Sequence, residues 1–139
     1  MAKILSAGVV PLRRTGGSWR MLVLRAYKNW DFPKGVVEEG EEPIDAAKRE
    51  VTEETDLVDL EFNFGEEYRE TLPYAAGKVA RYYLAETKEE RVRLPISHAL
   101  GRPEHHEWRW VTLDEAEDLL PPRLAPILDW VRGVVDQRD

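Results

Sequence analysis

Residues 35–57 read GVVEEGEEPIDAAKREVTEETDL, and the glutamates near the end of this stretch constrain the fold and the chemistry more than any other part of the chain. On a helix, Glu50, Glu53 and Glu54 fall at positions i, i+3 and i+4, within one arc of about 100°. Carboxylates held so close together repel one another, so a hard divalent cation among them would explain the arrangement. A solvated acidic face on a surface helix is the alternative, and for three glutamates alone it is the more common case.

The neighbouring face of the same helix is apolar. Ile44, Ala47 and Val51 fall on it, so this face would hold the helix against a core while the carboxylates face a cleft. Pro43 suits the first turn of the helix, because its missing N–H would have no partner there in any case. We therefore expect a helix from Pro43 to about Thr55.

The spacing around the glutamates decides between a metal site and a solvated face. From Gly35 to Leu57 the chain has the pattern G-x5-E-x7-R-E-V-x-E-E-x-D-L. This pattern resembles the signature of the Nudix hydrolases and matches it at every defined position but one. The exception is Asp56, where the family has glycine. A helix commonly ends on a left-handed residue, where aspartate is tolerated at a cost of about 1 kcal/mol, so the substitution bears on helix termination.

The resemblance implies an α/β fold, an α/β/α sandwich with a mixed β-sheet, and a loop and helix that hold a divalent metal against a polyphosphate. The metal is usually magnesium, and manganese is a possible substitute. By position, the metal ligands are the backbone carbonyl of Gly35 and the carboxylates of Glu50, Glu53 and Glu54. Glu41 and Arg49 take a structural role, in which they pair and hold the loop against the helix. An all-oxygen ligand set is the kind that magnesium prefers.

Three further stretches resemble the diadenosine tetraphosphate hydrolases of the asymmetrically cleaving type. They are residues 29–35 (NWDFPKG), residues 72–86 (LPYAAGKVARYYLAE) and residues 104–110 (EHHEWRW). The substrate-binding residues that this resemblance implies are Lys34, Tyr74, Lys78 and Tyr83. RNA 5′-pyrophosphohydrolases and diphosphoinositol polyphosphate phosphohydrolases share parts of these stretches. Each residue also has a plain structural interpretation, as a surface lysine or a packed aromatic side chain.

Glu104 matches a glutamate that binds metal or acts as general base in the resembled group, with an exposed loop acid as the alternative. Cleavage of a phosphoanhydride needs a positioned water and a proton acceptor, and the catalytic candidates for this are Glu53, Glu54 and Glu104. We expect His105 to be structural or solvent-exposed. Trp30 is a candidate to close the mouth of the cleft.

Composition fits one compact domain, and we expect residues 1–139 to form a single hydrolase domain. The formal charge of −7 argues against an extended nucleic-acid or membrane surface, so an anionic substrate must be met locally. The absence of cysteine excludes disulfides, zinc–thiolate sites and cysteine nucleophiles. The apolar part of the N-terminus is too short for a secretory signal, and we expect a cytoplasmic protein. The sequence does not predict an oligomeric state.

The other elements follow from periodicity and turn residues. β-rich runs at 4–12 and 19–25 flank a turn-like stretch and predict a hairpin. Residues 60–69, 79–86 and 107–111 are further predicted strands, with a break at 73–77. Thr112 and Glu115 form a capping-box pattern that opens a helix through Leu120. A last helix has a buried stripe of Leu124, Ile127, Leu128, Val131 and Val135.

Together these features predict a magnesium-dependent hydrolase of a nucleoside polyphosphate small molecule, with diadenosine tetraphosphate cleaved to ATP and AMP as the leading case. The same chemistry on triphosphorylated RNA ends or on a diphosphoinositol is the enzymatic alternative. A sensor with this fold that binds a nucleotide without cleaving it is the non-enzymatic one. The intact glutamate cluster argues against a sensor, because binding alone does not require so repulsive an arrangement.

Overall fold

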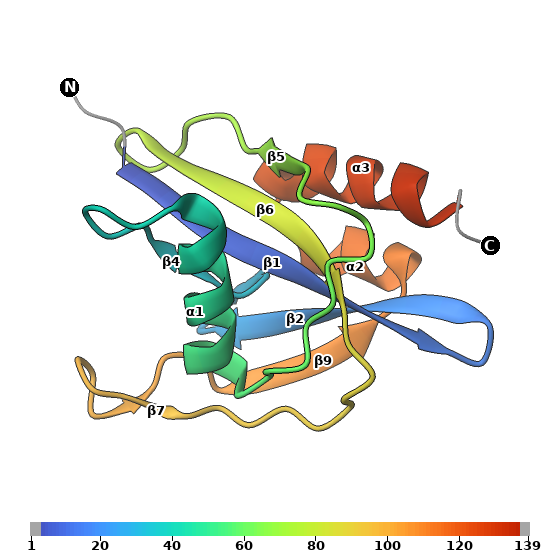
Figure 1. Ribbon diagram of the computed structural model, residues 1–139, viewed down its shortest axis with the longest axis horizontal. Coiled ribbons are helices and arrows are strands. Elements are labelled where there is room, and N and C mark those ends of the chain that lie inside the picture. Colours follow the sequence, from blue (N-terminus) through green and yellow to red (C-terminus); the bar gives the residue numbers. More distant parts are fainter. Residues whose placement is uncertain (1–3, 137–139) are drawn as a thin grey trace.

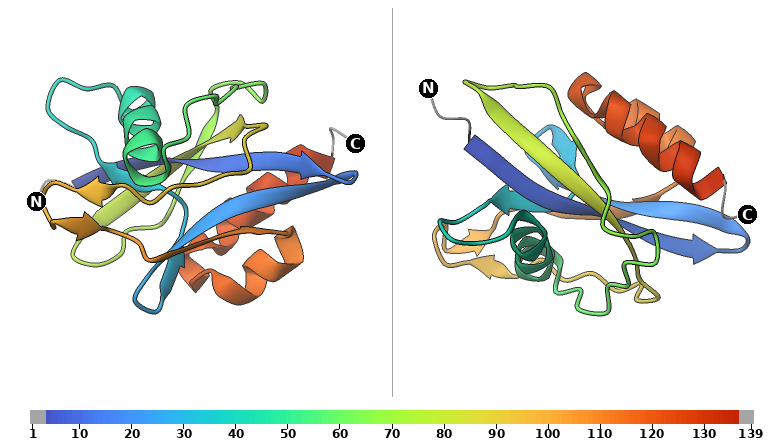
Figure 2. Two further views of the ribbon diagram at one scale, coloured as in Figure 1. Left: turned by 90° about the horizontal axis from the view of Figure 1, so that it is seen from below. Right: turned by 45° about the horizontal axis from the view of Figure 1, so that its top comes forward.

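A computed structural model describes residues 4–136 of the chain. It contains a mixed β-sheet with helices on both faces, as the sequence predicts (Figures 1 and 2). In chain order the elements are β1 (Ile4–Thr15), β2 (Ser18–Ala26), β3 (Asn29–Asp31), β4 (Lys34–Val36), α1 (Pro43–Thr55), β5 (Tyr68–Glu70), β6 (Lys78–Glu86), β7 (Ile96–Ser97), β8 (Arg102–Pro103), β9 (Glu107–Val111), α2 (Leu113–Leu119), the 3-10 turn η1 (Pro122–Leu124) and α3 (Ala125–Asp136). No helix among the described residues has the length and apolarity needed to cross a bilayer.

The sheet is organised around β1. Its main order is β3-β2-β1-β6-β5, and the pairing of β1 with β6 is parallel, whereas its pairings with β2 and β4 are antiparallel. Along one edge, β1 pairs with β4 at residues 6–8 and with β2 at residues 12–15. This change of partner brings β4, with Gly35 at its centre, beside helix α1, so the strand arrangement places the glycine next to the glutamates.

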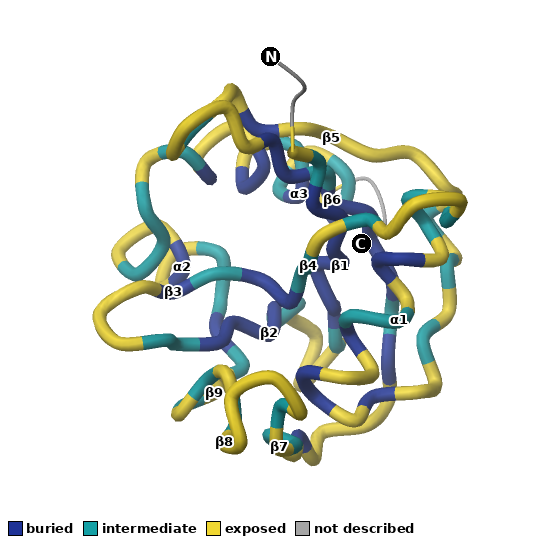
Figure 3. The backbone as a smooth tube through the Cα atoms, turned by 90° about the vertical axis from the view of Figure 1, so that its left-hand side faces the viewer, coloured by how far each residue is buried: buried dark blue, intermediate teal, exposed yellow. Residues whose placement is uncertain are grey.

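Two hydrophobic clusters cover the two faces of the sheet. Side chains of β1 and β6 alternate between them, because successive residues of a strand point to opposite faces. The first cluster packs under α2 and α3, and the second packs under α1. The buried stripe predicted for the last helix is confirmed: four of its positions lie in α3, and the fifth, Leu124, is buried in the preceding turn η1. Figure 3 shows the resulting buried path through β1, β2 and β6, whereas the residues of β7 and β8 are exposed or half-buried.

Most predicted elements are present. The hairpin, the strand at 79–86, the strand at 107–111 and the capping box at Thr112 are confirmed. The strand predicted for residues 60–69 is wrong, since only one bridge at Glu61 and the short β5 form there. Gly65 explains the interruption, because its φ of 87° accompanies a turn in which its N–H donates to the Phe62 carbonyl at 3.0 Å.

Helix α1 ends as the sequence predicts, on a residue in the left-handed conformation. Asp56 has φ 63° and ψ 13°, and its N–H donates to the Thr52 carbonyl oxygen at 2.9 Å. A side chain in this conformation costs about 1 kcal/mol, which glycine avoids.

Asp56→Gly should therefore raise the free energy of unfolding by about 0.5–1 kcal/mol, reduced by the greater freedom of glycine in the unfolded chain. Asp45→Gly is the matched control. Asp45 lies in the first turn of α1, where glycine should lower stability by about 0.5 kcal/mol. Urea unfolding of the wild type and both variants measures whether each change raises or lowers the free energy of unfolding. Destabilisation by both changes would contradict strain at position 56.

Candidate active site

Helix α1 presents its three glutamates at very different depths. The Glu53 side chain keeps 56% exposure, Glu50 keeps 13% and Glu54 keeps 4%. Ala47 and Val51 are buried beneath them, so the predicted apolar face does hold the helix to the sheet. The cluster therefore runs from the cleft rim, at Glu53, to its floor, at Glu54.

Arg49 ties the loop before α1 to the helix. Its Nε donates to Glu41 Oε2 at 2.9 Å and its Nη2 to Glu41 Oε1 at 3.0 Å, so the pairing expected of these two residues is present as a bidentate contact. Nη1 donates to Glu50 Oε1 at 2.8 Å. The bond from Arg49 lowers the pKa of Glu41 below its ordinary value. This geometry fixes the Glu50 carboxylate from one side.

Gly35 fixes the same carboxylate from the other side. A Cβ atom at position 35 would lie 2.0 Å from Glu50 Cδ, so the carboxylate occupies the space that any side chain would need. Gly8 is equally crowded, but by backbone: its Cβ would lie 2.2 Å from the Pro33 carbonyl oxygen. Gly35 thus makes room for the Glu50 carboxylate, and Gly8 allows β4 to approach β1.

Gly35→Ala should displace the Glu50 carboxylate and lower kcat/KM by about 10²-fold, with little loss of stability, because a flexible side-chain end can swing away. Gly8→Ala should do the opposite and destabilise the fold by about 1–3 kcal/mol, because backbone must move. Thermal unfolding and initial rates of both variants provide the comparison. A stability loss in Gly35→Ala as large as that in Gly8→Ala would contradict this division.

Glu54 is a buried acid that lacks a partner. Both of its carboxylate oxygens are buried and accept no hydrogen bond from the described residues, and His105 Nδ1 lies 3.8 Å from Oε1. Burial raises the pKa of Glu54 well above its ordinary value, the nearby Glu50 and Glu104 add to the effect, and the backbone N–H of Lys34 opposes it only weakly. Burial, followed by the charge of Glu50, also raises the pKa of Glu104. Such an orphaned carboxylate beside further carboxylates fits a site for a divalent cation.

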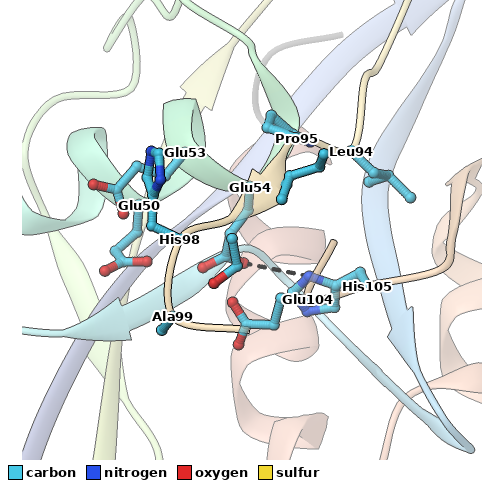
Figure 4. A pocket seen from close by; sticks show the side chains of 11 residues that line it. Glu50, Glu53, Glu54, Leu94, Pro95, His98, Ala99, Glu104 and His105 are labelled. Carbon is cyan, nitrogen blue, oxygen red and sulfur yellow. Dashed lines mark ion pairs between the residues drawn. The ribbon is translucent and has the colours of Figure 1, made fainter. Parts of the chain in front are cut away.

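Two cavities meet at this cluster, and Glu50 and Glu104 line both of them. The first, of about 490 Å³, also contains Glu53, Glu54 and the 94–99 segment (Figure 4). The second, of about 440 Å³, is lined by Gly35 and by three of the four predicted substrate-binding residues, Lys34, Tyr74 and Lys78. The structure thus brings together the metal candidates and these three residues, although they are spread over 70 positions of sequence.

A tight turn joins Tyr74 to Lys78. The Tyr74 N–H donates to the Lys78 carbonyl at 2.9 Å, and the Lys78 N–H donates back at 2.7 Å. Between them, Ala75 and Ala76 have φ of 39° and 63°, which side chains rarely adopt. Backbone strain of this kind costs about 1–3 kcal/mol per residue and is commonly found at binding sites.

Sequence patterns did not indicate the roles of Asp31 and Arg123. Asp31 Oδ2 accepts a hydrogen bond from Arg123 Nη2 at 2.8 Å, and Oδ1 accepts one from the Tyr82 hydroxyl at 2.7 Å. Lys34 Nζ lies 3.7 Å from Asp31, and the Arg123 guanidinium lies 4.4 Å from the centre of the Tyr74 ring. The network connects two of the residues that line the second cavity, and Arg123 covers one face of Tyr74.

Three expectations need correction. Tyr83 is buried in the cluster under α1, on the opposite face of the sheet from its strand neighbour Tyr82, and lines neither cavity. Trp30 is a core residue with the Arg109 guanidinium 4.9 Å from its ring centre, so it does not close the cleft. His105 lines the first cavity, and burial lowers its pKa to about 4. Its position two residues before a strand gave no sign of this.

Comparisons with known proteins agree with this geometry. A Caenorhabditis elegans protein named bis(5'-nucleosyl)-tetraphosphatase [asymmetrical] is 33% identical over 119 residues, which cover 81% of this chain and 82% of that protein. The Mus musculus protein of the same name is 36% identical over 91 residues, covering 63% of this chain but only 58% of the mouse protein. The crystal structure of a C. elegans Ap4A hydrolase binary complex has a TM-score of 0.81 at 28% identity, covering 96% of this chain and 98% of that one.

The family assignment rests on a match across most of the chain. The model described as the NUDIX domain matches residues 2–131. The glutamate helix, the bidentate Glu41–Arg49 pair and the crowded Gly35 all lie inside that match. The chain therefore belongs to the Nudix family of hydrolases.

Proposed function

We propose that this Nudix protein hydrolyses a phosphoanhydride bond of diadenosine tetraphosphate and releases ATP and AMP. The observation that carries the proposal is the junction of the two cavities, where a carboxylate cluster stands beside two lysines and an aromatic ring. The relatives and the solved structure named for this activity support it. We also propose that the chain acts as a single domain, and a cytoplasmic location remains the prediction of the sequence.

We propose magnesium as the metal, with manganese as a substitute. Its ligands would be the Gly35 carbonyl oxygen and the carboxylates of Glu50, Glu53, Glu54 and Glu104. The unpartnered oxygens of Glu54 and the carboxylate chemistry of the cluster fit such an ion. When bound, it would neutralise phosphoryl oxygens and lower the pKa of a coordinated water.

The chain's own residues would then position the substrate. Lys34 and Lys78 place cationic groups along the second cavity, where they can meet phosphates. Arg123 covers one face of the Tyr74 ring, so adenine would stack on the other face. Glu53 and Glu104 are exposed enough to take a proton from the attacking water, and Glu54 is the third candidate for that role.

A substrate panel tests the proposal. Catalytic efficiency should be highest for diadenosine tetraphosphate, compared with triphosphorylated RNA and an inositol pyrophosphate at the same ionic strength. The local lysines suit a short polyphosphate, and the net charge of −7 disfavours a long nucleic acid. Higher efficiency on RNA ends or on the inositol compound would overturn the assignment and favour one of the alternative substrates.

Tyr74→Ala tests the adenine contact directly. If the ring stacks on a base, its loss should cost about 1–3 kcal/mol and appear mainly as a raised Michaelis constant for diadenosine tetraphosphate. The ratio of catalytic efficiencies for diadenosine tetraphosphate and an inositol pyrophosphate should fall accordingly. Tyr68→Ala is the control, because Tyr68 is exposed and lines neither cavity. A constant ratio in Tyr74→Ala would make Tyr74 ordinary packing.

A further inference from the structure

His105 occupies an unusual place for an imidazole. It lies in the segment between β8 and β9, directly after Glu104, and its side chain keeps only 11% exposure. Figure 4 shows the Glu54, Glu104 and His105 side chains pointing toward one another from helix α1 and from this segment. One possible ligand atom from each of the three lies within 4.8 Å of the other two. Two chain segments about 50 residues apart therefore converge on one point.

The spacing of these groups argues against a direct hydrogen bond. His105 Nδ1 lies 3.8 Å from Glu54 Oε1, whereas nitrogen–oxygen hydrogen bonds measure about 2.7–3.2 Å. Two ligands that each stand about 2.1 Å from one metal ion are separated by about 3–4 Å, depending on their angle. The observed separation lies in that second range.

Glu54 provides an independent sign of a bound ligand. Its side chain keeps only 4% exposure, and neither carboxylate oxygen accepts a hydrogen bond from the described residues. A buried carboxylate without a partner is costly, and a coordinated cation removes that cost. The imidazole beside it offers a neutral nitrogen lone pair, so the group combines oxygen and nitrogen ligands.

We propose that His105 supplies a nitrogen ligand, with Glu54 and Glu104, to one divalent ion at the floor of the cleft, and that this position prefers a transition-metal ion such as Mn²⁺ over Mg²⁺. Imidazole nitrogen favours first-row transition metals, whereas magnesium favours oxygen-only sets. The inference rests on the metal site of the proposed function. It adds a ligand and a metal preference that the glutamate signature does not contain.

Electron paramagnetic resonance of Mn²⁺ bound to the substrate-free protein tests the inference. Electron spin-echo modulation should show coupling to ¹⁴N in the wild type, and the coupling should change to that of ¹⁵N when histidine alone carries the heavier isotope. This measurement needs no variant to fold and no activity. Mn²⁺ that binds without any nitrogen coupling would overturn the role of His105 and leave the proposed hydrolysis standing. Absence of Mn²⁺ binding would overturn the inference together with the metal site itself.

The His105→Gln variant tests whether His105 supplies the coupled nitrogen and the preference for Mn²⁺ over Mg²⁺. Even outer-shell partners of metal ligands are worth about 10- to 100-fold in affinity, so loss of a direct ligand should weaken Mn²⁺ binding at least about tenfold. Mg²⁺ affinity should fall much less. His98→Gln and His106→Gln are the controls, because His98 lines the same cavity and His106 follows in the chain with its ring nitrogen 3.3 Å from the Tyr27 carbonyl. Persistent nitrogen coupling in His105→Gln, or an equal loss for both metals, would overturn the proposal.

Discussion

Glu54→Gln should lower the turnover number by about 10²- to 10⁴-fold while the metal-free variant melts no lower than the wild type. The activity loss is expected because the change removes one charge from the floor of the site and little volume. The stability is expected to hold because the wild-type carboxylate is buried without a hydrogen-bond partner, and a neutral amide is less costly to bury. Steady-state kinetics and thermal unfolding in excess chelator measure the two effects.

Glu39→Gln is the matched control for this prediction. Glu39 carries the same charge, lies in the loop before α1, is exposed and lines neither cavity. Its replacement should change both quantities little, since exposed charges contribute about 0–1 kcal/mol. If Glu54→Gln loses melting temperature in proportion to its activity, Glu54 has a structural role and does not serve as a metal ligand.

Chelation is expected to have the second large effect. Excess EDTA should abolish hydrolysis, and magnesium or manganese added beyond the chelator should restore it. Five carboxylates line the two cavities against two lysines, so a substrate polyanion would meet net repulsion from the chain alone.

Initial rates across a magnesium titration measure this dependence. The melting temperature should rise over the same concentrations, because a ligand that binds the folded state stabilises it. Undiminished hydrolysis in excess EDTA would show that the carboxylate cluster does not serve a metal.

The sequence predicted the elements whose signals are local. Helix α1 begins at Pro43 and ends on a left-handed Asp56, as a proline in the first turn and a helix-end substitution indicated. The capping box at Thr112 is likewise a matter of residues three positions apart. Strands of two or three residues, such as β4 and β7, are too short to show a period, and they were not predicted.

Local sequence signals did not predict how deeply each side chain of the site is buried. Helical spacing puts Glu53 and Glu54 on one face, yet Glu53 is exposed and Glu54 is buried, with His105 and Glu104 converging on Glu54 from a distant segment. Arg123 lies 92 positions from Asp31, and only the packed fold reveals that they bond. The family pattern identified the chemistry, whereas long-range contacts set the burial and the partners of each residue.

Identification of the products decides whether the protein cleaves diadenosine tetraphosphate asymmetrically. The purified protein would be incubated with diadenosine tetraphosphate and magnesium, and the products would be separated by ion-exchange chromatography at early times. We expect ATP and AMP in equal amounts in the presence of magnesium, and unchanged substrate in the presence of excess EDTA or with Glu54→Gln. ADP as the sole product, or intact substrate alongside hydrolysis of another polyphosphate, would contradict asymmetric cleavage of diadenosine tetraphosphate.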